Sequence, residues 1–239
     1  MNKQFKVFAV LGTIATALFL FATLVQWCFW QFIVPAFGTG KTCMLLGKGM
    51  LLSIFLAAYG LLLASYASIG SLRMSRRSSI FGLIGCGVYI LVLVMWVGQF
   101  FMSYEITYDS FYNFLIHFFE VIAFVLLGIS VLLLPKEALP KPICRLGSGG
   151  WFALVFVCLA EFLLYSPQFR LVDSIYSYQK ILSVLFLLLR IGSAVLTALT
   201  FIAILFIRKR DFSRSANVAG EGRAPFGQAR GLPGECGGR

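Results

Sequence analysis

The sequence predicts an all-α integral membrane protein, a bundle of about six transmembrane helices with both termini in the cytoplasm. Of its 239 residues, 60% are hydrophobic and only 12% are charged, whereas a soluble domain is about 25% charged. The apolar residues also gather in runs long enough to cross a hydrocarbon core of about 30 Å. Lipid offers no hydrogen-bond partner to a peptide group, so each run is expected to be a helix. The runs are too long for barrel strands of about ten residues.

The apolar runs define the expected spans in order along the chain. The first follows Lys3 and Lys6 and exceeds the apolar region of a cleavable secretory signal, about 7 to 15 residues, so we expect an uncleaved helix. The fifth is the shortest and contains Glu161, so it is expected to need Gly149 or Ser166 to complete its crossing. The predicted spans are Val7–Val34, Met50–Ile69, Ile80–Met102, Phe114–Leu134, Trp151–Tyr165 and Ile181–Ile207.

Basic residues near the span ends predict the orientation, because loops rich in Lys and Arg resist translocation. The richer side holds Lys3, Lys6, Arg73, Arg76, Arg77, Lys136, Lys141, Arg145, Arg208, Lys209, Arg210, Arg214 and Arg223, and the poorer side holds Lys41, Lys48, Arg170 and Lys180. The richer side is therefore predicted to be cytoplasmic, in a plasma or inner membrane. Omitting the fifth helix would place the basic tail outside, against the same rule, which supports keeping that helix.

The chain is expected to divide into a membrane domain, residues 1–210, and a disordered basic cytoplasmic tail, residues 211–239. The tail is rich in Gly and Arg and too poor in apolar residues to fold alone. The net charge of +11 does not predict nucleic-acid binding, because the basic residues form short clusters at helix ends rather than a folded basic face. Such clusters attract anionic lipid headgroups, so the lipid bilayer and these headgroups are the expected partners.

Signals for an enzyme or a cofactor are weak. The segment 38–42 reads GTGKT, but Pro35 stands where a phosphate-binding loop of the Walker type needs a glycine. The cysteines include no C-x-x-C pair, and His117 is the sole histidine, which rules out a multi-histidine metal site within the chain. No Asp lies within a predicted span, so a membrane protease of the aspartyl type is not supported. No cofactor and no metal are expected, and a non-enzymatic role is favoured.

Ionisable side chains inside the spans are the strongest functional signal, since each costs about 2.5 to 3.5 kcal/mol on insertion scales. His117 and Glu120 lie in the fourth span, Glu161 in the fifth and Arg190 in the sixth. In the predicted orientation all four fall in the outer half at overlapping depths, given a rise of about 1.5 Å per residue. We therefore expect one polar cluster, with Gln99 of the third span near it.

Helical spacing assigns further polar residues to the same chamber. Residues three or four positions apart share a helix face. The residues placed on the chamber by this rule are Asn113 with His117 and Glu120; Cys158 with Glu161 and Tyr165; Arg190 with Ser193, Thr197 and Thr200; Gln99 with Trp96; and Gln26 with Trp30. The expected result is a polar chamber open to the outer face.

Two interpretations of the cluster stay open. Arg190 paired with Glu120 or Glu161 could simply lock three helices together. One arginine cannot neutralise both glutamates, however, so the second is available to carry a proton or to await a cation, and Arg190 is a candidate for recognising an anion. This favours a small solute or ion transporter whose site is Glu120, Glu161, Arg190, His117 and Gln99.

The alternative function is a membrane accessory or assembly subunit without a substrate. Such a subunit would bind a membrane-protein partner through faces of small residues, which let helices approach closely. The second span carries a stripe of this kind, formed by Ser53, Ala57, Gly60, Ala64 and Ser68.

Overall fold

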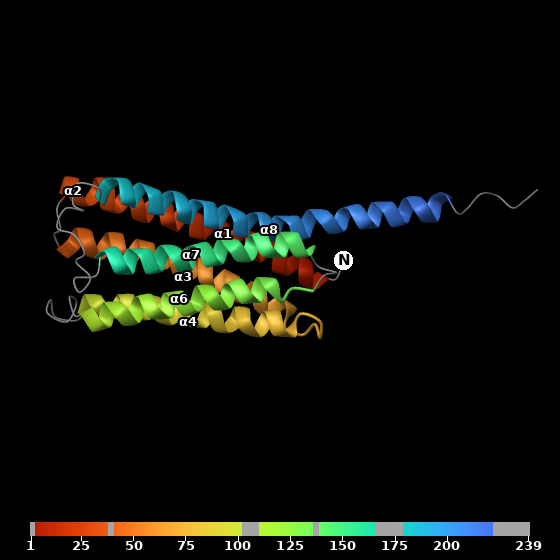
Figure 1. The fold of residues 1–239 in the computed structure, drawn as a ribbon, viewed down its shortest axis with the longest axis horizontal. Coiled ribbons are helices and arrows are strands. Elements are labelled where there is room, and N and C mark those ends of the chain that lie inside the picture. The colour runs from red at the N-terminus through yellow and green to blue at the C-terminus, as the bar shows by residue number, and fades with distance from the viewer. Residues whose placement is uncertain (1–2, 38–40, 102–109, 136–138, 166–178, 222–239) are drawn as a thin grey trace, which may run out of the picture.

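The structure, a computed structural model, describes residues 3–37, 41–101, 110–135, 139–165 and 179–221 and is helical with short turns over them (Figure 1). Its elements are α1 (Lys3–Cys28), the π-helix η1 (Phe29–Ile33), α2 (Val34–Phe37), α3 (Lys41–Ile69), α4 (Arg76–Phe101), α6 (Ser110–Leu132), α7 (Lys141–Tyr165) and α8 (Gln179–Glu221). Within this part of the chain, six segments are long and apolar enough to cross a membrane: Lys3–Ala36, Leu46–Ile69, Arg76–Gly98, Phe114–Leu132, Lys141–Leu163 and Ile181–Phe206. The predicted all-α, multi-pass transmembrane fold is confirmed.

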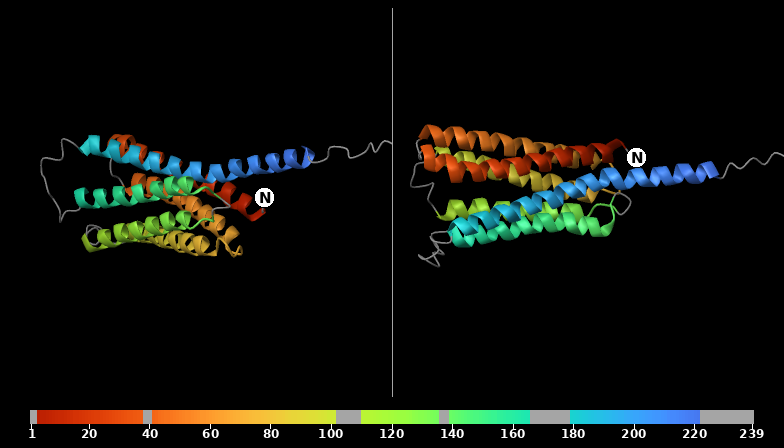
Figure 2. Two further views of the ribbon diagram at one scale, coloured as in Figure 1. Left: turned by 45° about the vertical axis from the view of Figure 1, so that its right-hand side comes forward. Right: turned by 90° about the horizontal axis from the view of Figure 1, so that it is seen from above.

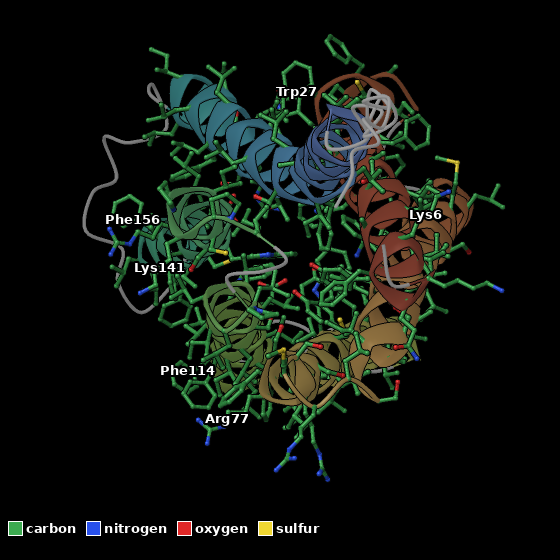
Figure 3. All side chains as sticks on the ribbon, turned by 90° about the vertical axis from the view of Figure 1, so that its right-hand side faces the viewer. Lys6, Trp27, Arg77, Phe114, Lys141 and Phe156 are labelled. Atoms are coloured by element: carbon green, nitrogen blue, oxygen red, sulfur yellow. The ribbon has the colours of Figure 1, made fainter. Side chains whose placement is uncertain are left out.

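The six long helices close into a ring. Each packs against the long helix before and after it in the chain, and α8 returns to pack against α1. Successive helices run in opposite directions, so α1 begins and α8 leaves the bundle at the same end (Figures 1 and 2). We call this end the terminal end and the opposite end, where α1 turns toward α3, the distal end. Figure 3 looks along the ring from the terminal end and shows side chains filling its centre.

Basic residues collect at the terminal end. Lys6, Arg77 and Lys141, labelled in Figure 3, lie within the first residues of α1, α4 and α7, which all begin there. Arg76 and Arg145, on α4 and α7, are likewise exposed. The distribution that predicts a cytoplasmic terminal end is therefore carried by residues on alternate helices around the ring.

The start of the fifth span at Trp151 is predicted wrongly. Helix α7 begins at Lys141, because the segment Gly147–Gly150, which resembles a loop in sequence, is helical and packs tightly on α8. A methyl group on Gly147 would lie 2.2 Å from Thr200 Oγ1, and one on Gly150 would lie 2.8 Å from the carbonyl oxygen of Ser193. Small residues of this kind allow two membrane helices to approach closely. The residues that lower the local hydropathy are thus packing residues, and α7 reaches spanning length.

The distal end of α1 changes helix type. In η1 the N–H of Val34 donates to the carbonyl oxygen of Phe29, which widens the helix just before Pro35, a residue that has no N–H to continue the ordinary pattern. The Phe29 ring is buried and fills the space beside Gly47 of α3, where a methyl group would lie 1.9 Å from the ring. This contact joins η1 to α3 at the distal end.

Helix α8 continues past the membrane span to Glu221 and projects beyond the bundle (Figures 1 and 2). Residues 211–221, which the sequence assigned to the tail, are therefore helical in the structure. The rest of the tail, residues 222–239, lies outside the described residues.

The terminal half of the ring is held by neutral polar contacts between helices. Ser65 Oγ donates to the carbonyl oxygen of Phe8 at 2.8 Å, Ser78 Oγ to that of Ser130 at 2.7 Å, and Ser130 Oγ lies 2.6 Å from Tyr66 Oη. The Tyr66 ring covers Gly82 of α4, where a methyl group would lie 2.3 Å from it. Hydrogen bonds between side chains and a neighbouring helix stabilise a bundle where water is absent.

Candidate functional site

A cavity of about 120 Å³ lies in the distal half of the ring, and every one of the six long helices lines it. The contributors are Gln26 of α1; Phe55 of α3; Tyr89, Val92, Leu93 and Trp96 of α4; His117 and Glu120 of α6; Glu161 of α7; and Arg190 of α8. One water molecule needs roughly 10–15 Å³ on the same measure. The cavity therefore has room for several water molecules or for one small solute on the axis of the bundle.

Glu161 and Arg190 form an ion pair between α7 and α8. Arg190 Nη2 donates to Glu161 Oε2, and both side chains are mostly buried. Arg190 Nε is buried too and has no hydrogen-bond partner among the described residues. A charge held in a membrane bundle is tolerated when it is paired, so this contact fixes the two helices to each other and commits the arginine charge to Glu161.

His117 and Glu120 form a second pair, one turn apart on α6. His117 Nδ1 lies 3.1 Å from Glu120 Oε2, and 34% of the histidine side chain is exposed against 11% of the glutamate side chain. Because α6 runs from the distal end inward, Glu120 lies about 4.5 Å deeper than His117. The histidine thus lies nearer the distal end, and the carboxylate lies deeper in the bundle.

The charge balance of the cavity depends on His117. Arg190 is within electrostatic range of Glu120, but its ion pair is with Glu161. A neutral His117 leaves one uncompensated carboxylate in the cavity, and a protonated His117 balances it. The buried thiol of Cys158 also lies beside Glu120. The site can therefore hold either one proton or one cation in excess of the Glu161–Arg190 pair.

Aromatic side chains fill the axis of the helix ring on the terminal side of the cavity. Tyr59 and Tyr89 stack with centroids 3.8 Å apart, Phe19 meets Tyr59 edge-on at 6.0 Å, and Phe124 lies 5.4 Å from Tyr89. We call these rings, together with Phe55 beside Phe19 and Trp151 beside Phe124, the aromatic layer. All of its members are buried.

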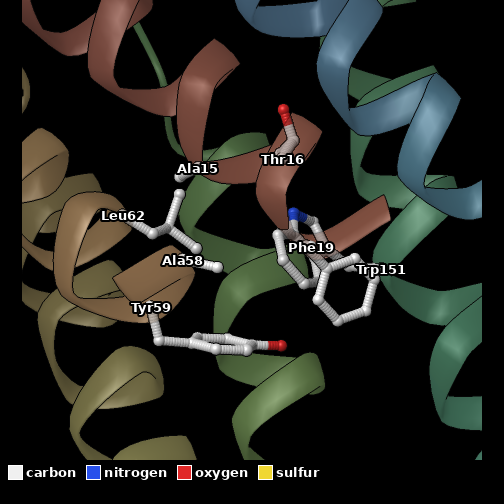
Figure 4. Close-up of a pocket in the computed structure, with 7 residues that line it drawn as sticks. All are labelled: Ala15, Thr16, Phe19, Ala58, Tyr59, Leu62 and Trp151. Carbon is white, nitrogen blue, oxygen red and sulfur yellow. The ribbon is translucent and has the colours of Figure 1, made fainter. Parts of the chain in front are cut away.

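The aromatic layer separates the cavity from the terminal half. Phe55 and Tyr89 line the cavity, whereas Phe19, Tyr59 and Trp151 line a void of about 10 Å³ on the layer's other side (Figure 4). The volume of that void is at the lower limit of the roughly 10–15 Å³ that one water molecule needs. The side chains of the aromatic layer therefore lie between the polar cavity and the terminal half of the bundle.

The structure brings four predicted site residues, His117, Glu120, Glu161 and Arg190, to one cavity, together with Gln26 and Trp96. The side chain of Gln99 lies outside the described part of the chain, as do those of Asn113 and Tyr165. Trp30, expected beside Gln26, is exposed instead, with the Lys48 ammonium 6.0 Å from its ring.

The hydroxyl groups expected to extend the chamber along α8 do not line the cavity. Ser193, Thr197 and Thr200 each donate to a carbonyl oxygen of their own helix. Their face packs against Gly147 and Gly150 of α7. Helical spacing alone places them on the Arg190 face, but it cannot tell a face that meets a cavity from one that meets a glycine.

Trp96 was expected at the site, but sequence reasoning missed the rest of its aromatic side, formed by Phe55 and Tyr89. The available signal was the position of Tyr59 and Tyr89 in the middle of apolar spans, since a buried phenol hydroxyl normally needs a partner. Phe55 carries no such signal, because phenylalanine is common throughout the spans.

Among the described residues, no three His, Cys, Asp or Glu side chains are placed to share a metal ion. Comparisons of the chain with protein-family models, curated proteins and solved structures find no match. The function is therefore inferred from the chemistry of the site.

Proposed function

We propose that this protein is a small transporter that binds a charged solute or ion in the distal cavity and passes it along the ring axis. One observation carries the proposal: two carboxylates, a histidine and an arginine from α6, α7 and α8 line a single cavity to which all six long helices contribute. Ionisable groups at membrane depth are costly and commonly mark solute or proton pathways.

The arrangement of the helices supports the same function. A cavity on the axis of a closed ring borders every helix, so a change in helix packing alters its access and its shape. The aromatic layer would be the barrier between the cavity and the terminal end, and transport requires its rings to move apart. In this proposal the terminal end faces the cytoplasm, where the basic residues of α1, α4 and α7 contact anionic lipid headgroups.

The test is a current measurement on the purified full chain reconstituted in vesicles on a solid-supported membrane. Concentration jumps of sodium, potassium, tetramethylammonium, acetate and glutamate would be applied as separate probes. We expect a current with at least one probe, and we expect Glu120→Gln, Glu161→Gln and Arg190→Lys to reduce it about tenfold or more, since a lost charged contact is worth about 1.5–3 kcal/mol.

Matched controls keep the same chemistry outside the cavity. Glu221→Gln lies at the end of α8, beyond the bundle, and Arg145→Lys lies on the exposed face of α7. Both should give the wild-type current. Absence of current with every probe, or equal currents from the cavity variants and the wild type in correctly folded protein, contradicts a transport role.

A role as an accessory subunit is the second candidate, favoured by the outer face of α3. The small residues Ser53, Ala57, Gly60 and Ala64 are exposed there, and a methyl group on Gly60 would meet nothing within 4 Å. Small residues on a lipid-facing surface permit close approach of another helix. In an accessory subunit, Gly60→Leu would change the size of the complex crosslinked in native membranes, whereas a transporter that acts alone would keep both its size and its currents.

A further inference from the structure

The cavity of the proposed transporter has a charged side and an aromatic side. Glu120, Glu161 and Arg190 come from α6, α7 and α8, while Phe55, Tyr89 and Trp96 come from the neighbouring helices α3 and α4. Because the ring order is α1, α3, α4, α6, α7, α8, a bound solute meets carboxylates on one side and ring faces or edges on the other. We propose that the solute is a small organic cation, such as an alkylated ammonium ion, bound by Glu120 and the aromatic side.

The charges favour a cation over an anion. Among the described residues, the only arginine in the cavity lining is paired with Glu161, so an anion would have to displace a carboxylate to reach it. The ion-pair partner of Glu120 is His117, which compensates the carboxylate charge only when the imidazole is protonated. A monovalent cation beside Glu120 then neutralises the cavity, whereas an anion would leave two uncompensated negative charges near each other.

The lining favours an organic cation over a bare metal ion. Magnesium and calcium ions require about six or more oxygen ligands at close range. Here carbon-rich side chains, namely Phe55, Val92, Leu93 and the rings of Tyr89 and Trp96, make up half of the lining. Alkyl groups on an ammonium ion bury their surface against such walls, and its charge is attracted to aromatic faces, most strongly to that of tryptophan.

The size of the cavity agrees with this class of solute. A cavity needs roughly 10–15 Å³ on this measure to hold one water molecule, so the cavity of about 120 Å³ has room for several groups of that size. Tetramethylammonium, a central nitrogen with methyl groups around it, is of that order. A peptide or a sugar chain is not.

This inference rests on the proposed solute site, and its test is direct binding to the purified full chain in detergent. Isothermal titration calorimetry with tetramethylammonium chloride, sodium chloride and sodium acetate at matched ionic strength compares the cation classes and an anion. We expect tetramethylammonium to bind more tightly than sodium and acetate not to bind. Glu120→Gln should weaken tetramethylammonium binding about tenfold to a hundredfold.

Aromatic variants test the second half of the inference. Trp96→Leu and Tyr89→Leu should weaken tetramethylammonium binding about threefold to thirtyfold, because they remove a ring while keeping an apolar wall. Trp96→Phe and Tyr89→Phe keep a ring, so they should retain most of the affinity, and they keep the test informative if the leucine variants fold poorly.

The outcomes separate the two proposals. Tighter binding of acetate, or equal binding of sodium and tetramethylammonium with no effect of the aromatic variants, overturns the organic-cation inference and leaves a solute site in place. Absence of binding by every probe in folded protein overturns both. Ring-dependent and Glu120-dependent binding of tetramethylammonium supports both.

Discussion

The two halves of the ring use polar residues in opposite ways. In the terminal half the buried polar groups are neutral, and Ser65, Ser78 and Ser130 each reach a partner on a neighbouring helix. In the distal half four ionisable groups line a cavity, and one of them, Arg190, has a buried Nε without a partner among the described residues. Hydroxyl groups that are hydrogen-bonded and border no cavity are typical of helix packing. Charged groups around a cavity are typical of a binding site. Each half therefore predicts a different response to mutation.

The largest loss of stability is expected in the distal half, from breaking the Glu161–Arg190 pair. Glu161→Gln removes one charge and leaves Arg190 without its ion-pair partner, which we expect to cost about 3 kcal/mol of unfolding free energy. Unfolding in bicelles, followed by the loss of helical circular dichroism, measures the change.

The double variant Glu161→Gln with Arg190→Gln serves as the control. It removes both charges, so it should recover at least half of the lost stability. If Glu161→Gln alone is as stable as the wild type, the ion pair does not hold α7 against α8. The two halves of the ring would then differ only in that the distal half contains a cavity.

A tight glycine contact in the terminal half gives the next largest effect. In Gly82→Ala the new methyl group would lie 2.3 Å from the Tyr66 ring, which is buried and whose hydroxyl group contacts Ser130. Overpacking of this kind costs about 1–3 kcal/mol. Gly87→Ala on the same helix is the matched control, because a methyl group there meets nothing within 4 Å. The same unfolding measurement should separate the two variants, and equal stability would mean that the Tyr66 ring can move aside.

Much of the fold and of the charged cluster in the distal half could be predicted from the sequence. Hydropathy predicts the spanning helices because burial in lipid demands long apolar runs, and periodicity places His117 and Glu120 on one face of α6. The charged residues could be assigned to one cluster because their depths overlap. The start of α7 could not be predicted, since Gly147–Gly150 look the same in sequence whether they form a loop or a close helix contact. Of the aromatic side of the cavity, only Trp96 could be predicted, because which phenylalanine or tyrosine meets a cavity depends on how the ring of helices closes.

A smaller effect is expected from one hydroxyl group in the terminal half. Ser130→Ala removes the contact with Tyr66 Oη and leaves Ser78 bound to the backbone of residue 130. A hydrogen bond between membrane helices is worth about 0.6 kcal/mol on average and at most about 1.7. We expect a loss in that range without any change in solute current. Ser53→Ala, whose hydroxyl group is exposed and bonds only within α3, should change stability less, and a loss of current in Ser130→Ala would show that the two halves are coupled.

The smallest change in stability is expected at the residue that matters most for the proposed transport. Glu120→Gln keeps the size of the side chain and a group that can bond His117, while it removes a buried charge, so the unfolding free energy should change by no more than about 1 kcal/mol. A purely structural Glu120 would behave like Glu161, and its loss would lower stability by about 3 kcal/mol. Parallel unfolding and current measurements on Glu120→Gln and Glu161→Gln distinguish these cases. Loss of current at unchanged stability assigns Glu120 to the solute, and loss of both makes it a second structural pair.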